Sequence, residues 1–204
     1  MNAKSIVVMA SGRGSNLRVL LDAIKRGECP VDVHLVISDR ADAGALAIAR
    51  QAGVAEVLHI NPKDYADREE YDVACGDAIE AAGCQWVVLA GYMRILSPRF
   101  VQRFAGSIIN IHPALLPAFT GADGVGDALK YGVKFSGCTV HLVDDVLDGG
   151  PILAQAVVPV EDNDDYESLH QRIQAEEHLL YPATLKRIVE DGFYIKGRRV
   201  IWRV

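Results

Sequence analysis

Short apolar segments alternate with longer helix-like segments over the first 112 residues, and this alternation restricts the fold more than any other feature. The apolar segments, each long enough for one strand, are residues 5–10, 31–37, 56–59, 85–90 and 107–111. The helix-like segments between them are residues 16–26, 43–52, 68–82 and 99–104. Strands that alternate with helices at this spacing are typical of βαβ units on a parallel sheet. The sequence therefore predicts an α/β fold, a Rossmann-like, open, mostly parallel sheet flanked by helices.

The pattern changes after residue 112. A proline- and glycine-rich loop over residues 114–126 precedes a short helix near 127–131, and two strand-like runs follow at 138–143 and 152–160. A long helical segment spans 166–190, where Pro182 is expected to kink or split the helix. A hairpin of strands 193–195 and 200–202 turns around Gly197. We expect an antiparallel extension of the sheet here, and one domain, 1–204, with halves 1–112 and 113–204.

Composition limits the classes of function. Half of the residues are hydrophobic, which suffices for an independent core, and the net charge of −6 disfavours a nucleic-acid-binding surface. The longest apolar run, residues 86–90, is far shorter than the ~20 residues that cross a bilayer. The segment from Met1 to Lys4 leads directly into the first strand, unlike a signal peptide. We expect a cytoplasmic protein that binds neither membrane nor nucleic acid.

Four cysteines are scattered along the chain, at Cys29, Cys75, Cys84 and Cys138. They form no CxxC pair and have no histidine cluster beside them, so they favour neither a zinc site nor a disulfide framework. We interpret them as small buried hydrophobic residues and expect no metal.

Two polar residues mark the end of the predicted strand 107–111. Asn110 and His112 are two positions apart, so their side chains project from the same face, and Pro113 ends the strand because it has no N–H to donate. Ligands of open α/β sheets bind at the carboxyl ends of the strands. An amide that donates a hydrogen bond beside an imidazole that moves a proton suits acyl transfer. The alternative is a pair of hydrogen-bonded core residues.

Asp148 and His141 are two further polar residues that could have either a functional or a structural role. Asp148 lies in a turn before two glycines, with Asp144 and Asp145 as rival carboxylates. Its functional interpretation requires that it orient the His112 ring and stabilise the imidazolium. His141 lies in the middle of a strand-like run, where a structural role is favoured.

The first predicted βα turn reads SGRGSN, residues 11–16. Its glycines let the backbone approach a ligand, Ser15 and Asn16 can donate hydrogen bonds, and the following helix offers N-terminal amides, so the turn suits a phosphate. It lacks the GK[ST] of a Walker A loop, and Leu17 replaces the third glycine of GxGxxG. A tight turn with a polar helix cap is an equally good interpretation. The incomplete glycine pattern argues against Asp39 as the ribose-binding acid of a dinucleotide site.

Four motifs resemble those of the phosphoribosylglycinamide formyltransferase family, the folate-dependent glycinamide ribonucleotide transformylases. They span residues 11–16 (SGRGSN), 91–97 (GYMRILS), 109–117 (INIHPALLP) and 147–151 (LDGGP). The likeness is collinear from about residue 5 to residue 202. It implies the formyltransferase fold, and transfer of a formyl group from the co-substrate 10-formyltetrahydrofolate to the amino group of glycinamide ribonucleotide in purine biosynthesis, without a metal.

The resemblance also implies site residues. The catalytic residues are Asn110, His112 and Asp148. The nucleotide residues are Gly14, Ser15 and Asn16 at the phosphate and Glu177 at the ribose. The folate residues are Arg68, Met93, Arg94, Ile95, Leu96 and Asn110, with backbone groups of 93–96 reading the pterin edge. Residues 1–112 become a nucleotide-binding half and residues 113–204 a folate and catalytic-loop half, in a monomer or homodimer.

One loop departs from the family pattern. Thr120 stands where members of the family often have proline, and Asp123 stands where some have histidine. The run Gly124-Val125-Gly126 adds flexibility. Because the loop neighbours the expected site, we expect these changes to affect its closure and substrate affinity more than the catalytic step.

Three alternatives stay open. A formyltetrahydrofolate hydrolase shares the Asn–His–Asp core but usually carries a regulatory domain before the sheet, whereas the first strand here starts at residue 5. A methionyl-tRNA formyltransferase usually adds a basic RNA-binding domain. A non-catalytic Rossmann-type nucleotide-binding module would leave Asn110, His112 and Asp148 without a role.

Overall fold

The structure is a computed structural model that describes residues 4–203; residues 1–3, at the start of the expected N-terminal segment, and residue 204 lie outside this range. The chain divides into two compact units, Met1–Ile109 and Asn110–Val204. The expected single domain with halves that meet at residue 112 stays a prediction. Within residues 4–203, no helix combines the length and the apolar character that a membrane crossing requires.

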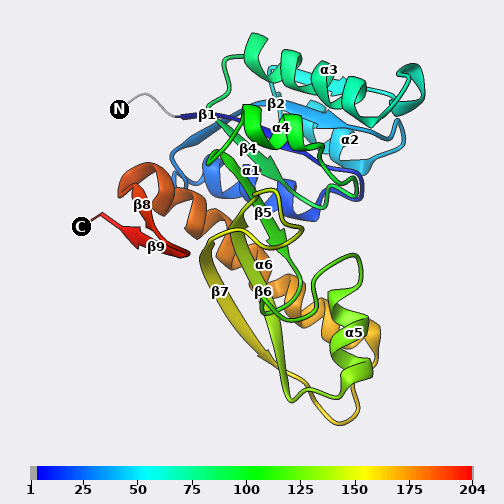
Figure 1. Cartoon of the computed structure of the whole chain (residues 1–204), viewed down its shortest axis with the longest axis vertical. Coiled ribbons are helices and arrows are strands. Elements are labelled where there is room, and N and C mark those ends of the chain that lie inside the picture. Colours follow the sequence, from blue (N-terminus) through cyan, green and yellow to red (C-terminus); the bar gives the residue numbers. More distant parts are fainter. Residues whose placement is uncertain (1–3, 204) are drawn as a thin grey trace. The chain divides into compact units, whose positions relative to one another are not determined.

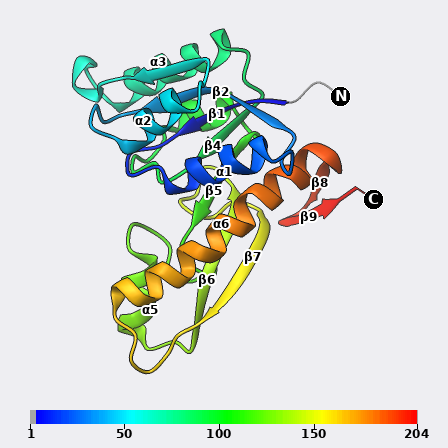
Figure 2. The same cartoon turned by 180° about the vertical axis from the view of Figure 1, so that it is seen from behind.

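The first unit is a parallel sheet with helices packed on it. Its strands are β1 (Lys4–Met9), β2 (Val31–Ser38), β3 (Glu56–His59) and β4 (Trp86–Leu89), in the spatial order β3-β2-β1-β4. Its helices are α1 (Ser15–Lys25), α2 (Gly44–Gln51), α3 (Arg68–Ala81) and α4 (Pro98–Arg103), with a 3-10 helix η1 (Pro62–Asp64) that the sequence did not predict. α1 packs with α2, and α3 packs with α4 (Figures 1 and 2).

Two apolar runs, residues 6–9 of β1 and 35–37 of β2, become strand segments that are buried on both faces. Ile6, Val7, Val8 and Met9 of β1 are all fully buried, and Leu35 and Ile37 of β2 are buried as well. A strand whose successive side chains are all apolar fits a parallel sheet that helices cover on both sides. Each strand therefore ends at a loop whose position is set by a rigid, buried element.

The second unit begins inside β5 (Ile108–His112), which runs into it from the first unit. Its further elements are α5 (Gly124–Tyr131), β6 (Phe135–Leu142), β7 (Ile152–Pro159), α6 (Tyr166–Glu190), β8 (Phe193–Lys196) and β9 (Arg199–Trp202). β6 and β7 pair antiparallel, β7 pairs parallel with β9, and β8 and β9 form an antiparallel hairpin. The predicted α/β fold, a mostly parallel sheet with helices and an antiparallel extension in the C-terminal half, is confirmed.

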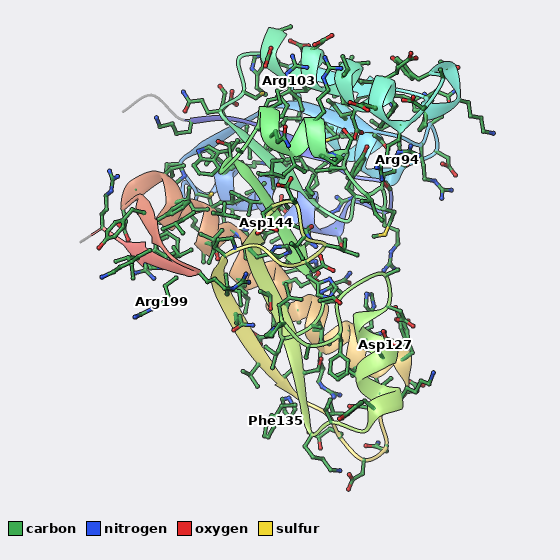
Figure 3. All side chains as sticks on the ribbon, viewed as in Figure 1. Arg94, Arg103, Asp127, Phe135, Asp144 and Arg199 are labelled. Atoms are coloured by element: carbon green, nitrogen blue, oxygen red, sulfur yellow. The ribbon has the colours of Figure 1, made fainter. Side chains whose placement is uncertain are left out.

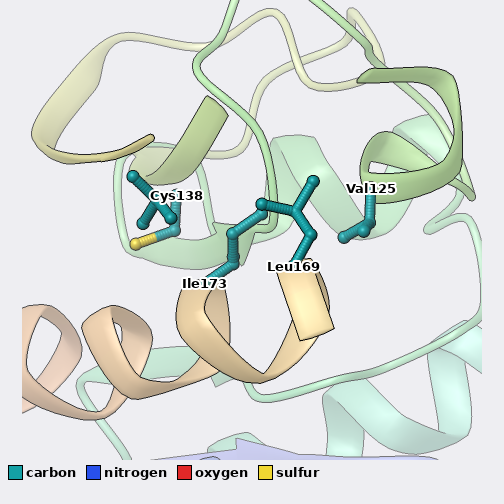
Figure 4. Packing of buried hydrophobic residues seen from close by; sticks show 5 residues of the cluster. Val125, Cys138, Leu169 and Ile173 are labelled. Carbon is teal, nitrogen blue, oxygen red and sulfur yellow. The ribbon is translucent and has the colours of Figure 1, made fainter. Parts of the chain in front are cut away.

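α6 stays one helix across Pro182, so the expectation of a split is wrong. Asp165 caps its first turn, since its carboxylate accepts a hydrogen bond from the Ser168 N–H at 2.8 Å. Leu169 and Ile173 of α6 point toward Val125 of α5 and Cys138 of β6 in one buried cluster (Figure 4). Side chains both before and after Pro182 are buried, among them Ile173 and Leu185, and this burial stabilises the helix against the roughly 3 kcal/mol that a proline inside a helix costs.

Candidate active site

Four polar side chains meet at the carboxyl end of β5 in the second unit. Nδ1 of His112 lies 3.6 Å from Oδ2 of Asp148, and Nε2 of His141 lies 3.8 Å from Oδ1 of the same carboxylate. Nδ2 of Asn110 lies 3.1 Å from Nε2 of His141. The side chains of His112, His141 and Asp148 are 5%, 2% and 9% exposed. A carboxylate between two imidazoles, with an amide beside them, is thus held almost out of water.

The two rival carboxylates lie elsewhere in the same turn. Oδ1 of Asp144 accepts a hydrogen bond from the Val146 N–H at 2.9 Å, and Asp145 is exposed. Asp148 is the one that lies within 4 Å of His112. The structure therefore brings together Asn110, His112 and Asp148, as the sequence predicted.

The glycines after Asp148 are required by the shape of its turn. Asp148 has a φ of 51°, a left-handed conformation that is uncommon for a residue with a side chain. The next N–H, that of Gly149, closes the turn on the Val146 carbonyl at 2.9 Å. A Cβ at Gly150 would lie only 1.9 Å from the carbonyl oxygen of Leu142. The Asp-Gly-Gly sequence therefore holds the carboxylate against the end of β6.

The loop 118–124 contacts both members of the His112–Asp148 pair. Nε2 of His112 lies 2.7 Å from the Phe119 carbonyl oxygen, and because a carbonyl only accepts, this nitrogen carries the donated proton. The Gly121 N–H donates to Oδ2 of Asp148 at 2.8 Å. A Cβ at Gly124 would lie 3.2 Å from both His112 Nε2 and the Phe119 oxygen, so a glycine fits there. The loop thereby orients the imidazole and supports the carboxylate.

Asp123, which departs from the family pattern, acts as a helix cap. Its carboxylate accepts a hydrogen bond from the Gly126 N–H at 3.0 Å, and α5 starts at Gly124, three residues before the expected start near 127. The hydrogen bond of this side chain is therefore made to the first turn of α5. Thr120, the other departure, is exposed.

His141 joins the cluster, where sequence reasoning favoured a structural role. Its Nδ1 lies 2.8 Å from the Leu142 carbonyl, so Nδ1 carries a proton. Burial lowers the pKa of His141, although the Leu142 carbonyl and the Asp148 charge act in the opposite direction. The sequence held no clear signal for the Asn110–His141 contact, because the two residues are 31 positions apart.

The predicted phosphate turn in the first unit precedes α1. Gly14 caps the helix with a φ of 80°, and a Cβ there would lie 2.7 Å from Cα of Ala45. The Ala45 N–H also donates to the Gly12 carbonyl at 3.2 Å, so the turn packs on the start of α2. Ser15 and Asn16 open α1 and are half-buried. Their backbone amides therefore lie in the first helical turn, where an anion is stabilised.

The predicted folate segment follows β4 and is tied to the same turn. The Ser11 N–H donates to the Gly91 carbonyl at 3.0 Å, and Oγ of Ser11 accepts from the Met93 N–H at 2.9 Å. Met93 is 76% exposed and Ile95 is 60% exposed, whereas Leu96 is buried. Two exposed apolar side chains on a segment with fixed backbone are suited to a flat apolar ligand.

A buried carboxylate supports this segment from α3. Oδ2 of Asp72 accepts a hydrogen bond from the Ser97 N–H at 2.5 Å, and the side chain is almost fully buried. Burial raises the pKa of Asp72, while the Ser97 hydrogen bonds and the charges of Arg68 and Arg94 lower it. The Arg94 guanidinium lies 4.7 Å from the centre of the Tyr71 ring, and Arg94 is labelled in Figure 3. Both predicted folate arginines therefore lie near Asp72.

Glu177, predicted at the ribose, lies on α6 in the second unit. Its side chain is buried. Burial raises the pKa values of the Tyr181 hydroxyl and the Cys138 thiol, and the negative charge of Glu177 raises them further. Among residues 4–203, no group of three His, Cys, Asp or Glu side chains is arranged to hold a metal ion.

Comparison with known proteins identifies the family. A sequence profile of the formyl transferase family matches residues 4–185. The phosphoribosylglycinamide formyltransferase of Mycobacterium tuberculosis (strain CDC 1551 / Oshkosh) is 49% identical over 193 residues, which cover 95% of this chain and 88% of that protein. The crystal structure of glycinamide ribonucleotide transformylase 1 from Symbiobacterium toebii has a TM-score of 0.96 and 44% identity, and covers 100% of this chain and 95% of its own.

A related enzyme with a different reaction has the same fold. The formyltetrahydrofolate deformylase from Pseudomonas syringae pv. tomato has a TM-score of 0.90 and 29% identity, over 99% of this chain and 66% of that one. The identity is higher for the transformylases named above, at 44% and 49%. The predicted resemblance is confirmed: the chain belongs to the formyl transferase family and, within it, to the phosphoribosylglycinamide formyltransferases.

Proposed function

We propose that this protein transfers the formyl group of 10-formyltetrahydrofolate to the amino group of glycinamide ribonucleotide. The cluster at the end of β5 carries the proposal, because it gathers an amide, an imidazole and a carboxylate: Asn110 contacts His141 at 3.1 Å, and the Asp148 carboxylate lies 3.6 Å from Nδ1 of His112. Such a set can donate hydrogen bonds to a developing oxyanion and move one proton. These are the two tasks that formyl transfer between nitrogens requires.

The reaction starts when the neutral amine of the nucleotide attacks the formyl carbon. A C–N bond forms, and negative charge develops on the formyl oxygen, to which the Asn110 amide and the protonated His112 donate hydrogen bonds. One such donor contributes on the order of 10²–10³ to the rate. The attacking nitrogen then gives up one proton, and the formyl C=O re-forms as the bond to the folate nitrogen breaks. The folate nitrogen receives a proton, and His112 or an ordered water carries the proton from one nitrogen to the other. Since Nε2 of His112 donates its hydrogen bond to the Phe119 carbonyl, Nδ1 is the ring nitrogen that would exchange a proton or a hydrogen bond with the reacting groups.

Asp148 acts on His112 in this scheme. Its carboxylate faces Nδ1 at 3.6 Å and would favour the charged imidazolium that donates to the oxyanion. The Phe119 carbonyl accepts a hydrogen bond from the ring, and the Asp148 turn lies beside it; both contacts would limit the motion of the imidazole and favour the reaction through preorganisation.

The proposed nucleotide-binding residues are those that the resemblance implies. The amides of Gly14, Ser15 and Asn16 would hold the phosphate at the start of α1, where the helix dipole favours an anion. The Glu177 carboxylate would accept hydrogen bonds from the ribose hydroxyls.

The folate is proposed to bind at the segment after β4. Met93, Ile95 and Leu96 would contact the pterin ring, and the backbone of residues 93–96 would read its polar edge. Arg94 would line the pterin pocket together with these residues, and Arg68 would be the basic residue that meets the folate side. Asn110 would contact the folate from the end of β5, next to its catalytic task. A cytoplasmic location stays a prediction. The oligomeric state is predicted to be a monomer or a homodimer, and light scattering distinguishes these two.

An absorbance assay tests the proposed reaction. Purified protein is mixed with a 10-formylfolate donor in the presence and absence of glycinamide ribonucleotide. We expect deformylation that requires the nucleotide. The fold shared with a formyltetrahydrofolate deformylase makes a hydrolase the second candidate, which would release formate without the nucleotide. Failure to deformylate in either case would contradict both candidates.

A further inference from the structure

We propose that His141 is a positioning residue whose unprotonated Nε2 accepts a hydrogen bond from Asn110 and thereby sets which way that amide faces. The two atoms, Nδ2 of Asn110 and Nε2 of His141, lie 3.1 Å apart. The inference rests on the proposed function, because Asn110 has a catalytic role only there. His141 itself contacts no substrate in this proposal and acts through Asn110.

The proton on the His141 ring can be assigned from its partners. Nδ1 lies 2.8 Å from the Leu142 carbonyl oxygen, which can only accept, so Nδ1 is the donor. A neutral imidazole has one N–H, which leaves Nε2 with a lone pair. A lone pair facing Asn110 selects the amide orientation in which Nδ2, and not Oδ1, points at the ring. One N–H of Asn110 is then used by His141, and the second N–H is left for the formyl oxygen.

The groups around His141 determine the pH range over which its ring stays neutral. Asp148 in the following turn, with Oδ1 3.8 Å from Nε2, and Asp144, labelled in Figure 3, favour the imidazolium. His112 on β5 opposes it, and so does burial, since His141 is almost inaccessible on β6. Burial is the largest of these influences and lowers the pKa of His141. The neutral, accepting form therefore persists at neutral pH.

Protonation would invert the contact. With protons on both ring nitrogens, Nε2 becomes a donor and faces the Asn110 amide group, which is also a donor. The amide must then turn so that Oδ1 faces His141, and its N–H groups leave the position in which they serve the oxyanion. Turnover is therefore expected to fall in acid for a reason that belongs to His141.

A nuclear magnetic resonance measurement tests the protonation state without any assay. Nitrogen chemical shifts of the histidine rings in labelled wild-type protein distinguish the two neutral tautomers and the imidazolium. We expect His141 in the neutral form with the proton on Nδ1. A proton on Nε2 at neutral pH, in either the neutral or the charged ring, would overturn the proposal. This result does not depend on whether the protein is a transformylase.

Two substitutions test the consequence for the reaction. His141→Gln places an amide oxygen near the position of Nε2 and keeps an acceptor for Asn110, whereas His141→Leu removes it. We expect kcat to fall about 10- to 100-fold in His141→Leu, because a donor is misplaced, and to return to within a few-fold of wild type in His141→Gln. The KM of glycinamide ribonucleotide should change less than about twofold, because Asn110 is not one of its proposed binding residues. The KM of the folate is expected to rise in His141→Leu only, since Asn110 is also proposed to contact the folate.

A matched control and a pH series complete the test. Ser136→Ala removes a buried hydroxyl from the same strand, one without a hydrogen-bond partner, and should keep the wild-type kcat. The ratio of wild-type to His141→Gln turnover should fall as the pH is lowered through the titration of His141. Full kcat in His141→Leu, or equal losses in both variants, would overturn the proposal. An inactive wild type would instead count against the proposed function.

Discussion

Nδ1 of His112 faces Oδ2 of Asp148 at 3.6 Å, while Nε2 of the same ring donates to the Phe119 carbonyl at 2.7 Å. One nitrogen of the ring is thus engaged by the backbone of a loop, and the other faces a carboxylate across a distance longer than a direct hydrogen bond. The loop fixes the orientation of the imidazole and Asp148 supplies the charge beside it. The proposed chemistry depends on both contacts being present together.

Substituting either residue of this pair should lower turnover by orders of magnitude. For His112→Ala and Asp148→Ala, we expect kcat to fall roughly 10²- to 10⁴-fold, because the proton-moving group or its partner is lost. Folate affinity should stay close to that of wild type. Because the residues act as a unit, the double variant should be little slower than either single variant. Steady-state kinetics and calorimetry measure both effects, and near-full turnover in Asp148→Ala would remove that residue from the chemistry.

The phosphate turn should be sensitive to the loss of one amide. Ser15 is the first residue of α1, where proline is tolerated in the helix, so Ser15→Pro removes one N–H donor and keeps the helix. We expect weaker binding of glycinamide ribonucleotide, roughly 10-fold for one lost charge-assisted hydrogen bond, and unchanged folate binding. Calorimetric titration with each ligand measures this. Unchanged nucleotide affinity would contradict the assignment of the turn.

A methyl group at Gly150 should destabilise the turn that holds Asp148. Its Cβ would lie 1.9 Å from the Leu142 carbonyl oxygen, so the turn or the end of β6 must move. We expect Gly150→Ala to lower the free energy of unfolding by about 1–3 kcal/mol or more, and to lower kcat as well. Denaturant unfolding measures the first effect. At Gly12, where a Cβ would meet nothing within 4 Å, alanine should change stability by less, and equal losses would contradict this explanation.

Many of the helices and strands could be predicted, because an element that is buried needs apolar residues at regular positions, and this pattern is visible in the local sequence. The apolar residues 6–9 of β1 and 35–37 of β2 predict strand segments that are covered on both faces, and all of these residues are buried. Boundaries that depend on one side chain were harder: α5 starts at Gly124, because Asp123 caps it, and not near 127. Pro182 stays inside α6, where side chains before and after it, such as Ile173 and Leu185, are buried and support the helix against the local preference of proline.

The candidate site was predictable to a similar degree. Asn110 and His112 could be found by their spacing at the end of a strand, and Asp148 by its turn and by resemblance. The contact of His141 with Asn110 could not, since it depends on which strand lies beside β5. The hydrogen bond from His112 to Phe119 could not be predicted from the sequence either, because its acceptor is a backbone carbonyl, which every residue has.

Asp72 should make stability depend on pH. Burial raises the pKa of this carboxyl in the folded protein, so folding favours the protonated form, and the stability gained from it is lost as the pH rises through the folded pKa. Asp72→Asn should therefore raise the free energy of unfolding at neutral pH, with no gain below the unfolded pKa of about 3.9. Its amide oxygen can still accept from Ser97.

The exposed residue Asp145 supplies the control for that experiment. Asp145→Asn should leave the free energy of unfolding unchanged across the same pH range, because its carboxylate is in contact with water. Denaturant unfolding at several pH values measures both variants. A loss of stability in Asp72→Asn at neutral pH would show that the charge of Asp72 is needed by Arg68 or Arg94.

Three cysteines should react slowly in the folded protein. Burial raises the pKa of the Cys75 and Cys138 thiols to about 12 and that of Cys84 to about 11. Because the thiolate is the reactive form, Cys75 and Cys138 have roughly 10³-fold less of it than a thiol of pKa about 8.5. Mass spectrometry after iodoacetamide treatment should find them unmodified in native protein and modified in urea. Rapid native labelling of Cys75 or Cys138 would contradict their burial.

The most direct test of the proposed function follows the formyl group itself. Wild-type protein is incubated with glycinamide ribonucleotide and a 10-formylfolate donor whose formyl carbon is isotopically labelled, and the products are separated and weighed by mass spectrometry. The account predicts that the label is found on the amino group of the nucleotide, with little labelled formate. Label found in formate alone, at the same rate without the nucleotide, would contradict it and identify a hydrolase.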